Sequence, residues 1–189
     1  SLALASVFSA VISVSFVAHS ASSSDFIASI SVLRASASVL IAAELMINNN
    51  DGKGLLFGNI TGVPPTEVVI LGAGTVAEYA VRTALSLGAN VKVFDNSITK
   101  LRRLQNTLNQ RIFTSTIHDK ALLKALRRCD VAIGALKGEN RTPIVVTETM
   151  VEYMKKGAVI VDVSIDTGGC FETSEITTHE HPTFIKNNV

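Results

Sequence analysis

The chain has 189 residues, with 17 Lys and Arg against 16 Asp and Glu, and 47% of its residues are apolar. Its net charge of +1 disfavours a nucleic-acid-binding protein, which usually carries a basic surplus. Two cysteines are too few for a disulfide framework or a four-cysteine zinc site. The length predicts one domain, or one domain with a fragment of another.

Residues 1–38 differ in composition from the rest of the chain. They contain 13 Ser and 8 Ala, and their only charged residues are Asp25 and Arg34. Three interpretations are open: a signal or membrane span, a flexible Ser-rich tail, or a fragment of another domain. The alternation of apolar residues and Ser at residues 11–17 suits a half-buried strand. Serines interrupt the apolar run and no basic region precedes it, so we expect no membrane segment. We place no functional residue in this segment.

From Ser38 onward the chain reads as a helix at 39–46, a Pro-containing turn, and then strands alternating with helices. Apolar strands that alternate with helices of about ten residues are typical of a parallel sheet covered on both faces. The sequence therefore predicts an α/β protein with a Rossmann-type, doubly wound parallel sheet over residues 39–189. Strands are expected at 67–71, 90–94, 111–114, 130–136 and 157–163, and helices at 75–87, 97–108, 119–128 and 147–155.

The first of these strands runs directly into the sequence GAGTVA at residues 72–77. This is a G-x-G-x-x-A form of the dinucleotide-binding fingerprint. Gly72 would permit the tight turn, Gly74 would let a diphosphate approach the backbone, and Ala77 would keep helix and strand close. The helix N-terminus offers free N–H groups to phosphates, and Thr75 could add a hydroxyl. A tight strand-to-helix turn without a ligand is the alternative.

Asp95 follows the second strand, 21 residues beyond Gly74. An acid at this position is expected to bind the hydroxyls of the adenine ribose. A carboxylate repels a 2′-phosphate, so NAD is favoured over NADP as the cofactor. Lys100 could reach the ribose or the adenine, or it could belong to a solvated helix face with Arg102 and Arg103.

Two acids and a glycine pair follow the fifth strand, in the sequence VDVSIDTGGCFE at residues 161–172. Ligands of open α/β sheets bind beyond the carboxyl ends of the strands, so Asp166 is expected near the nicotinamide and the substrate. A turn-forming role before Gly168 and Gly169 is the alternative for Asp166. Asp162 is interpreted as a residue that forms hydrogen bonds at the end of its strand.

The remaining reactive side chains are given no catalytic role. Cys129 is expected to be packed, and Cys170 to be structural because no basic neighbour in the sequence would lower its pKa. His179 and His181 lack a convincing third ligand, so no metal site is expected.

Five stretches of the sequence together resemble the alanine dehydrogenase family, which is related to the NAD-binding domain of proton-translocating nicotinamide nucleotide transhydrogenase. They are GVPP at 62–65, VVILGAG at 68–74, Phe94-Asp95, residues 161–172, and HPTF at 181–184. The stretch SIDTGGCFE at 164–172 is the most specific of them and is similar to the dehydrogenase branch.

The resemblance implies reversible oxidative deamination of L-alanine to pyruvate and ammonia with NAD, in a cytoplasmic, hexameric enzyme. Asp166 matches the family's catalytic aspartate. The resemblance also assigns Thr75 and Val76 to the pyrophosphate, Asp95 to the ribose and Lys100 to the adenosine end. The nicotinamide side would be lined by Ala135, Leu136, Val163, Ser164 and Ile165.

The family's catalytic His and its substrate-binding Arg and Lys have no match in residues 1–38. We therefore expect a fragment that holds the NAD-binding domain, with residues 1–38 as a remnant of the substrate domain, and that is inactive alone. The alternatives are a transhydrogenase NAD-binding domain and a non-catalytic NAD-sensing module.

Overall fold

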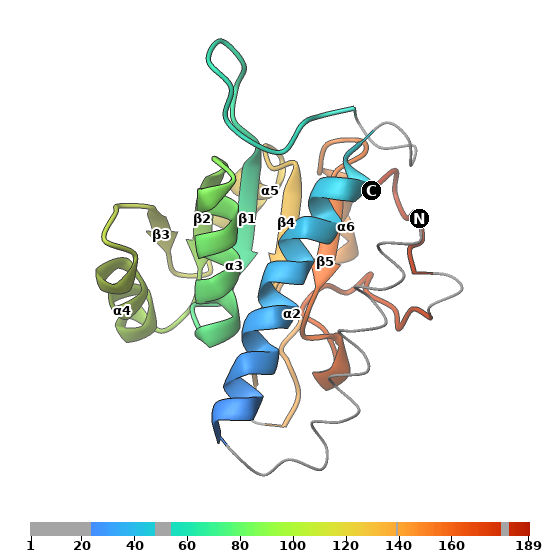
Figure 1. Ribbon diagram of the computed structural model, residues 1–189. Coiled ribbons are helices and arrows are strands. Elements are labelled where there is room, and N and C mark those ends of the chain that lie inside the picture. Colours follow the sequence, from blue (N-terminus) through green and yellow to red (C-terminus); the bar gives the residue numbers. More distant parts are fainter. Residues whose placement is uncertain (1–23, 48–53, 139, 179–181) are drawn as a thin grey trace.

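A computed structural model describes residues 24–47, 54–138, 140–178 and 182–189 of the chain. Its centre is a five-stranded sheet in which all strands are parallel, in the order β3-β2-β1-β4-β5 (Figure 1). The strands are β1 (Glu67–Leu71), β2 (Asn90–Phe94), β3 (Phe113–Ser115), β4 (Val131–Gly134) and β5 (Val159–Asp162). The helices are α2 (Ser24–Leu45), α3 (Thr75–Ser86), α4 (Ile98–Leu108), α5 (Asp119–Leu126) and α6 (Glu148–Glu152).

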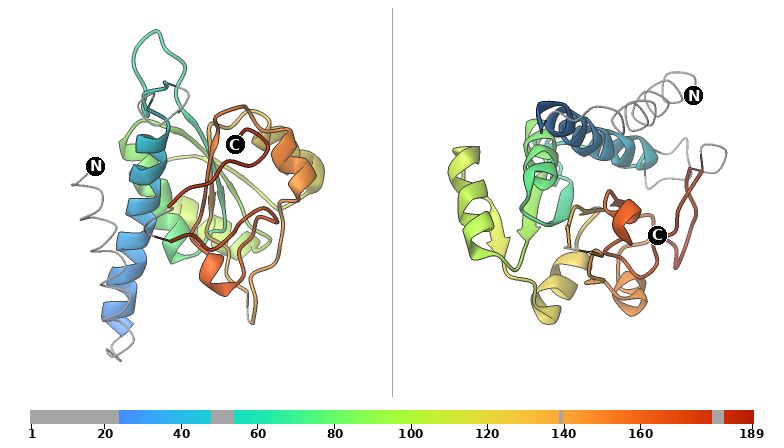
Figure 2. Two further views of the ribbon diagram at one scale, coloured as in Figure 1. Left: turned by 90° about the vertical axis from the view of Figure 1, so that its right-hand side faces the viewer. Right: turned by 90° about the horizontal axis from the view of Figure 1, so that it is seen from below.

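Helices cover both faces of the sheet, as Figure 2 shows from below. Successive residues of a strand point to opposite faces of the sheet. Ile70 of β1 packs with α2, α3 and α4 on one face, and Leu71 packs with α5 on the other. The chain winds outward from β1 to β3 and then returns, through α5, to β4 on the other side of β1. The order of the strands therefore reverses between β1 and β4, which is where open α/β sheets bind their ligands.

Local signals explain where several helices begin and end. The Ser97 side chain accepts a hydrogen bond from the backbone N–H of Lys100 at the start of α4 (3.3 Å), and Thr147 does the same for Met150 at the start of α6 (3.3 Å). Asn109 ends α4 in the left-handed conformation (φ +53°), which asparagine tolerates better than most residues.

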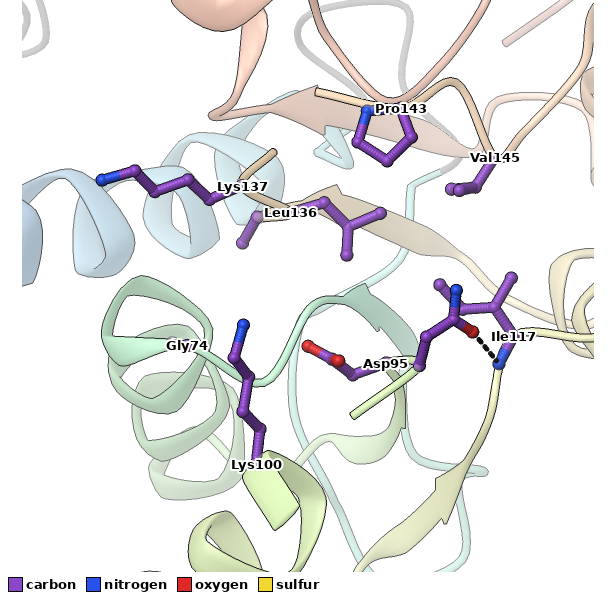
Figure 3. Close-up of a pocket in the computed structure, with 10 residues that line it drawn as sticks. Gly74, Asp95, Lys100, Ile117, Leu136, Lys137, Pro143 and Val145 are labelled. Atoms are coloured by element: carbon purple, nitrogen blue, oxygen red, sulfur yellow. Dashed lines mark hydrogen bonds between the residues drawn. The ribbon is translucent and has the colours of Figure 1, made fainter. Parts of the chain in front are cut away.

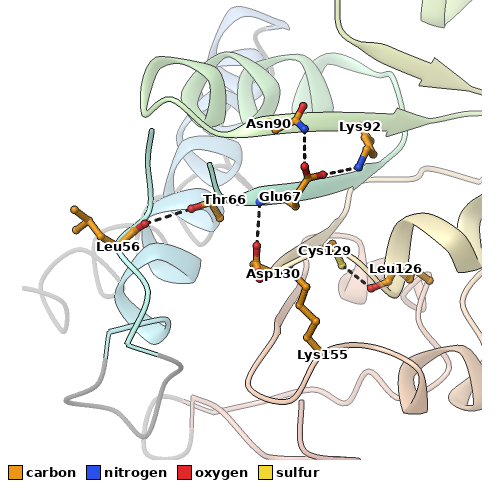
Figure 4. A network of polar contacts seen from close by, with 9 residues as sticks. All are labelled: Leu56, Thr66, Glu67, Asn90, Lys92, Leu126, Cys129, Asp130 and Lys155. Carbon is orange, nitrogen blue, oxygen red and sulfur yellow. Dashed lines mark hydrogen bonds and ion pairs between the residues drawn. The ribbon is translucent and has the colours of Figure 1, made fainter. Parts of the chain in front are cut away.

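The amino-terminal end of the sheet is held by charged side chains (Figure 4). Glu67 of β1 accepts hydrogen bonds from Asn90 and Lys92 of β2. Asp130 accepts one from the backbone N–H of Glu67 (3.1 Å) and pairs with the Lys155 ammonium (2.8 Å). These contacts lie at the end of the sheet away from the glycine loop, so their role is structural.

Several predicted bounds differ from the structure: the strand expected at 130–136 spans Val131–Gly134, the helix expected at 147–155 spans Glu148–Glu152, and two other elements begin at different residues. The helix expected at 39–46 begins at Ser24, so it crosses residue 38 without a break and runs through part of the Ser-rich segment. Its buried face includes Ala35, Val39 and Ala42, whose small side chains lie against the sheet and α3. The third strand begins at Phe113 instead of Arg111, because Phe113 is the residue paired with Lys92 of β2. Residues 11–17, the proposed strand, lie outside the described part of the chain.

Among the described residues, none of the helices combines the length and the apolar character needed to cross a membrane.

Candidate functional site

The glycine loop connects β1 to α3 and passes close to the chain that leaves β4. Gly72 has φ +114°, and a Cβ atom there would lie 2.4 Å from the carbonyl oxygen of Ala135. A Cβ at Gly74 would meet nothing within 4 Å. The two glycines therefore serve different purposes: Gly72 allows two backbone segments to pack, whereas Gly74 leaves open space at the start of α3. Ala77 is fully buried, as expected for the residue that brings helix and strand together.

Asp95 links the glycine loop to the start of α4. Its carboxylate accepts hydrogen bonds from the backbone N–H of Ala73 (2.8 Å) and of Ser97 (2.7 Å). Arg103 of α4 adds a second link, donating to the carbonyl oxygen of Ala73 (3.3 Å). Each carboxylate oxygen has two lone pairs, so Asp95 retains acceptor capacity for a further pair of hydroxyl donors.

A hollow of about 180 Å³ lies beyond the carboxyl ends of the strands, with Asp95 at its centre (Figure 3). It brings together five residues that the sequence assigns to the cofactor: Gly74, Asp95, Lys100, Ala135 and Leu136. Sequence reasoning gave no cofactor role to five others, namely Asn96, Ile117, Lys137, Pro143 and Val145. The rule that ligands lie beyond strand ends would have pointed to Ile117 and Lys137, which come just after β3 and β4.

The other residues assigned to the cofactor lie around this hollow without lining it. Thr75 is exposed on the first turn of α3, and the half-buried Val76 packs against the core. Val163 and Ile165 are half-buried beyond β5. Ser164 is buried, and its hydroxyl donates a hydrogen bond to Asp162 (2.6 Å). This hydroxyl is therefore not free to donate to a cofactor.

Asp162 organises the turn after β5, as predicted. Its carboxylate accepts hydrogen bonds from the backbone N–H groups of Ser164 (3.1 Å) and Cys170 (2.8 Å) and from the Ser174 hydroxyl (2.9 Å). Burial, and then the nearby Asp162 carboxylate, raise the pKa of the Cys170 thiol far above its ordinary value. A buried thiol with a raised pKa is a poor nucleophile, which agrees with the structural interpretation of Cys170.

Asp166 lies in the short 3₁₀ turn Ile165–Thr167, with its side chain about half exposed. The Arg34 guanidinium of α2 donates a hydrogen bond to this carboxylate at 3.3 Å. Arg141 lies against the same turn, since a Cβ at Gly168 would come within 2.8 Å of its side chain. The turn after β5 thus carries a carboxylate paired with the Arg34 guanidinium, and the Arg141 side chain packs against the same turn at Gly168.

The residues present fit a dinucleotide. Gly74 leaves space for phosphate beside the free N–H groups of α3, a helix of 12 residues. Asp95 follows the neighbouring strand β2 and lines the same hollow, at the position where an acid binds the ribose diol.

Comparison with known proteins gives the same assignment. The family model "Alanine dehydrogenase/PNT, C-terminal domain" matches residues 38–189. Alanine dehydrogenase of Mycolicibacterium smegmatis is 43% identical over 148 residues, which are 78% of this chain and 40% of that protein. This chain therefore spans about two fifths of the length of this curated relative.

Two solved structures share the fold. An L-alanine dehydrogenase superposes with a TM-score of 0.80 and 36% identity, covering 84% of this chain and 44% of the other. A transhydrogenase from Sinorhizobium meliloti superposes less well, with a TM-score of 0.61 and 25% identity over 79% of this chain and 44% of the other. These matches confirm the predicted family, the Rossmann-type fold and NAD as the cofactor. The chain belongs to the alanine dehydrogenase/PNT C-terminal domain family.

Proposed function

We propose that this chain is the NAD-binding domain of a cytoplasmic, oligomeric alanine dehydrogenase, which interconverts L-alanine with pyruvate and ammonia. The observation that carries the proposal is the hollow that joins Gly74 to Asp95 at the reversal of strand order. The dehydrogenase is favoured over a transhydrogenase because the solved dehydrogenase superposes better and at higher identity.

In this proposal the domain binds and orients the cofactor. Backbone N–H groups at the start of α3 hold the diphosphate, with Thr75 and Val76 on the same turn. Asp95 accepts hydrogen bonds from the ribose, and Lys100 lies at the adenosine end. Ala135 and Leu136 lead to the nicotinamide side, where Val163, Ser164 and Ile165 complete the wall. The bound nicotinamide supplies an acceptor for the hydride of the alanine Cα.

Asp166 is the proposed catalytic residue of the chain. Its carboxylate stands beyond the end of β5 and is accessible, so it can hold the ammonium group of the amino acid or take a proton from it. In the full-length protein, Asp166→Asn should lower kcat for L-alanine by roughly a hundredfold, since general acid–base groups contribute about that much or more. Activity close to that of the unmodified protein would remove this role.

Cofactor binding is tested by calorimetry on the 189-residue chain with NADH. Asp95→Ala should weaken binding by roughly tenfold or more, because hydrogen bonds to a charged group contribute about 1.5–3 kcal/mol. Asp119→Ala is the matched control, since Asp119 is exposed on α5. Unchanged affinity for the Asp95 variant would contradict the proposed ribose contact.

Asp95 also accepts hydrogen bonds from the backbone of Ala73 and Ser97, so Asp95→Ala could weaken NADH binding by changing the conformation of the glycine loop. A second ligand separates the two effects. The unmodified chain should prefer ADP to 2′,3′-dideoxy-ADP, and Asp95→Ala should abolish that preference. A preference that survives the substitution would show that another group binds the diol.

A further inference from the structure

Lys137 lines the hollow together with Lys100. Lys100 comes from the first turn of α4, whereas Lys137 follows β4 and Leu136. Figure 3 shows the Lys100 ammonium beside Gly74, and the Lys137 side chain extending from the strand β4 side of the hollow toward α2. Two lysine side chains from different elements therefore border the hollow.

The backbone that carries Lys137 is held at both ends. Before it, the backbone N–H of Ala135 donates to the carbonyl oxygen of Leu71 at 2.8 Å. After it, Thr142 bonds to Thr167 through its backbone N–H (2.8 Å) and its hydroxyl (2.6 Å). A Cβ at Gly138 would lie 1.9 Å from the Arg141 carbonyl oxygen, so the backbone of Gly138 lies close to that of Arg141. These bonds anchor the chain on both sides of Lys137.

The charges around Gly74 are unbalanced in the part of the chain that the structure describes. There, the ammonium groups of Lys100 and Lys137 pair with no carboxylate. Asp95, the carboxylate in the hollow, instead accepts from backbone N–H groups. The free N–H groups of α3 add positive potential at the same point. A bound group with two negative charges beside Gly74 would balance this arrangement.

We propose that Lys137 is a diphosphate-binding residue of this domain, which pairs with the phosphate oxygens while Lys100 contacts the adenosine end. The inference rests on the proposed NAD-binding function and extends it. A lysine ammonium is a compact charge on a flexible stem, which suits contact with phosphate. A lysine ammonium adds little to recognition of the adenine ring, and it repels the positively charged nicotinamide of oxidised NAD.

The test measures the affinities of NADH, ADP and adenosine for the 189-residue chain by calorimetry. Lys137→Ala should lower the affinities for NADH and ADP by about tenfold, which is the usual effect of losing one charge-assisted hydrogen bond. Adenosine, which lacks phosphate, should bind with unchanged affinity. Lys120→Ala is the matched control, because Lys120 is exposed on α5 and is not among the residues that line the hollow.

Two further measurements separate a charge contact from a structural effect. Lys137→Arg should recover most of the NADH affinity, and the Lys137→Ala chain should show a weaker dependence of affinity on salt concentration. If a thermal melt shows that the Lys137→Ala chain folds poorly, Lys137→Gln replaces it in the measurement of NADH affinity.

The proposal is overturned if Lys137→Ala binds NADH as tightly as Lys120→Ala, or if adenosine loses as much affinity as ADP. An unmodified chain that binds adenosine and NADH equally tightly would also overturn it. If the unmodified chain binds no NADH at all, the proposed NAD-binding function fails, and this inference fails with it.

Discussion

At the scale of single residues, the two glycines of the loop should respond differently to the same substitution. Gly72→Ala places a methyl group 2.4 Å from a backbone oxygen, at φ +114°. It should lower the free energy of unfolding by about 3 kcal/mol, combining backbone strain with the forced separation of the two segments. Urea denaturation measures this change. A loss below about 1 kcal/mol would show that the loop relaxes without cost.

Gly74→Ala is the matched variant, and its effect should appear in binding. The new methyl group meets no atom within 4 Å, and φ is −80°. Stability should fall by less than about 1 kcal/mol, the cost of alanine at an N-cap position. NADH affinity should fall by roughly tenfold or more, because the methyl group occupies the space expected for phosphate. Unchanged affinity would place the diphosphate elsewhere.

Cys129 gives a prediction about alkaline pH. Burial, and then the Asp130 carboxylate, raise the pKa of this thiol from 9.0 to about 12. Above pH 9 the unfolded chain loses this proton while the folded chain keeps it, so the free energy of unfolding falls as the pH rises from 9 toward 12. Cys129→Ala removes this contribution. The difference in stability between the two chains should therefore shrink over that pH range in urea titrations, and a constant difference would contradict the assignment.

At the scale of elements, the strands and helices after residue 66 were predictable because each carries its own signal. Apolar runs such as Glu67–Leu71 end at glycine or aspartate, and buried positions of α3 repeat at helical spacing. Helix α2 carries a weak signal, because serine occurs at both exposed and buried positions, such as Ser29 and Ser38. Its first half was therefore missed, and the proposed boundary at residue 38 stays a prediction.

The packing of α2 can be tested with two adjacent residues. Val39 is fully buried against the core, whereas Leu40 is 52% exposed. Val39→Ala should lower the free energy of unfolding by about 1–3 kcal/mol through the lost contacts and the cavity. Leu40→Ala should change it by less than about 0.5 kcal/mol. Equal effects in urea denaturation would mean that α2 does not pack as described.

At the scale of the whole molecule, sequence reasoning located one wall of the hollow better than the other. Gly74 and Asp95 follow from the fingerprint and its spacing, which fix their positions along the chain, whereas Lys100 was assigned to the cofactor by the family resemblance. Pro143 and Val145 reach the hollow through a long loop after β4, whose path depends on its bonds to the turn after β5. Such long-range contacts leave no local pattern in the sequence. The family resemblance supplied Ala135 and Leu136, which the fingerprint does not include.

The last prediction concerns which functions this chain performs and which need the rest of a full-length protein. The solved L-alanine dehydrogenase is more than twice as long as the segment that this chain matches, since the match covers 44% of it. The resemblance places the catalytic His and the Arg and Lys that bind the substrate carboxylate outside the matched region. The 189-residue chain should therefore bind NADH but produce no NADH from L-alanine and NAD, as followed by absorbance. A fused or separately added substrate domain should restore turnover, and Asp166→Asn in that assembly should remove most of it. Turnover by the chain alone would show that Asp166, Arg34 and Arg141 suffice to bind and process the amino acid.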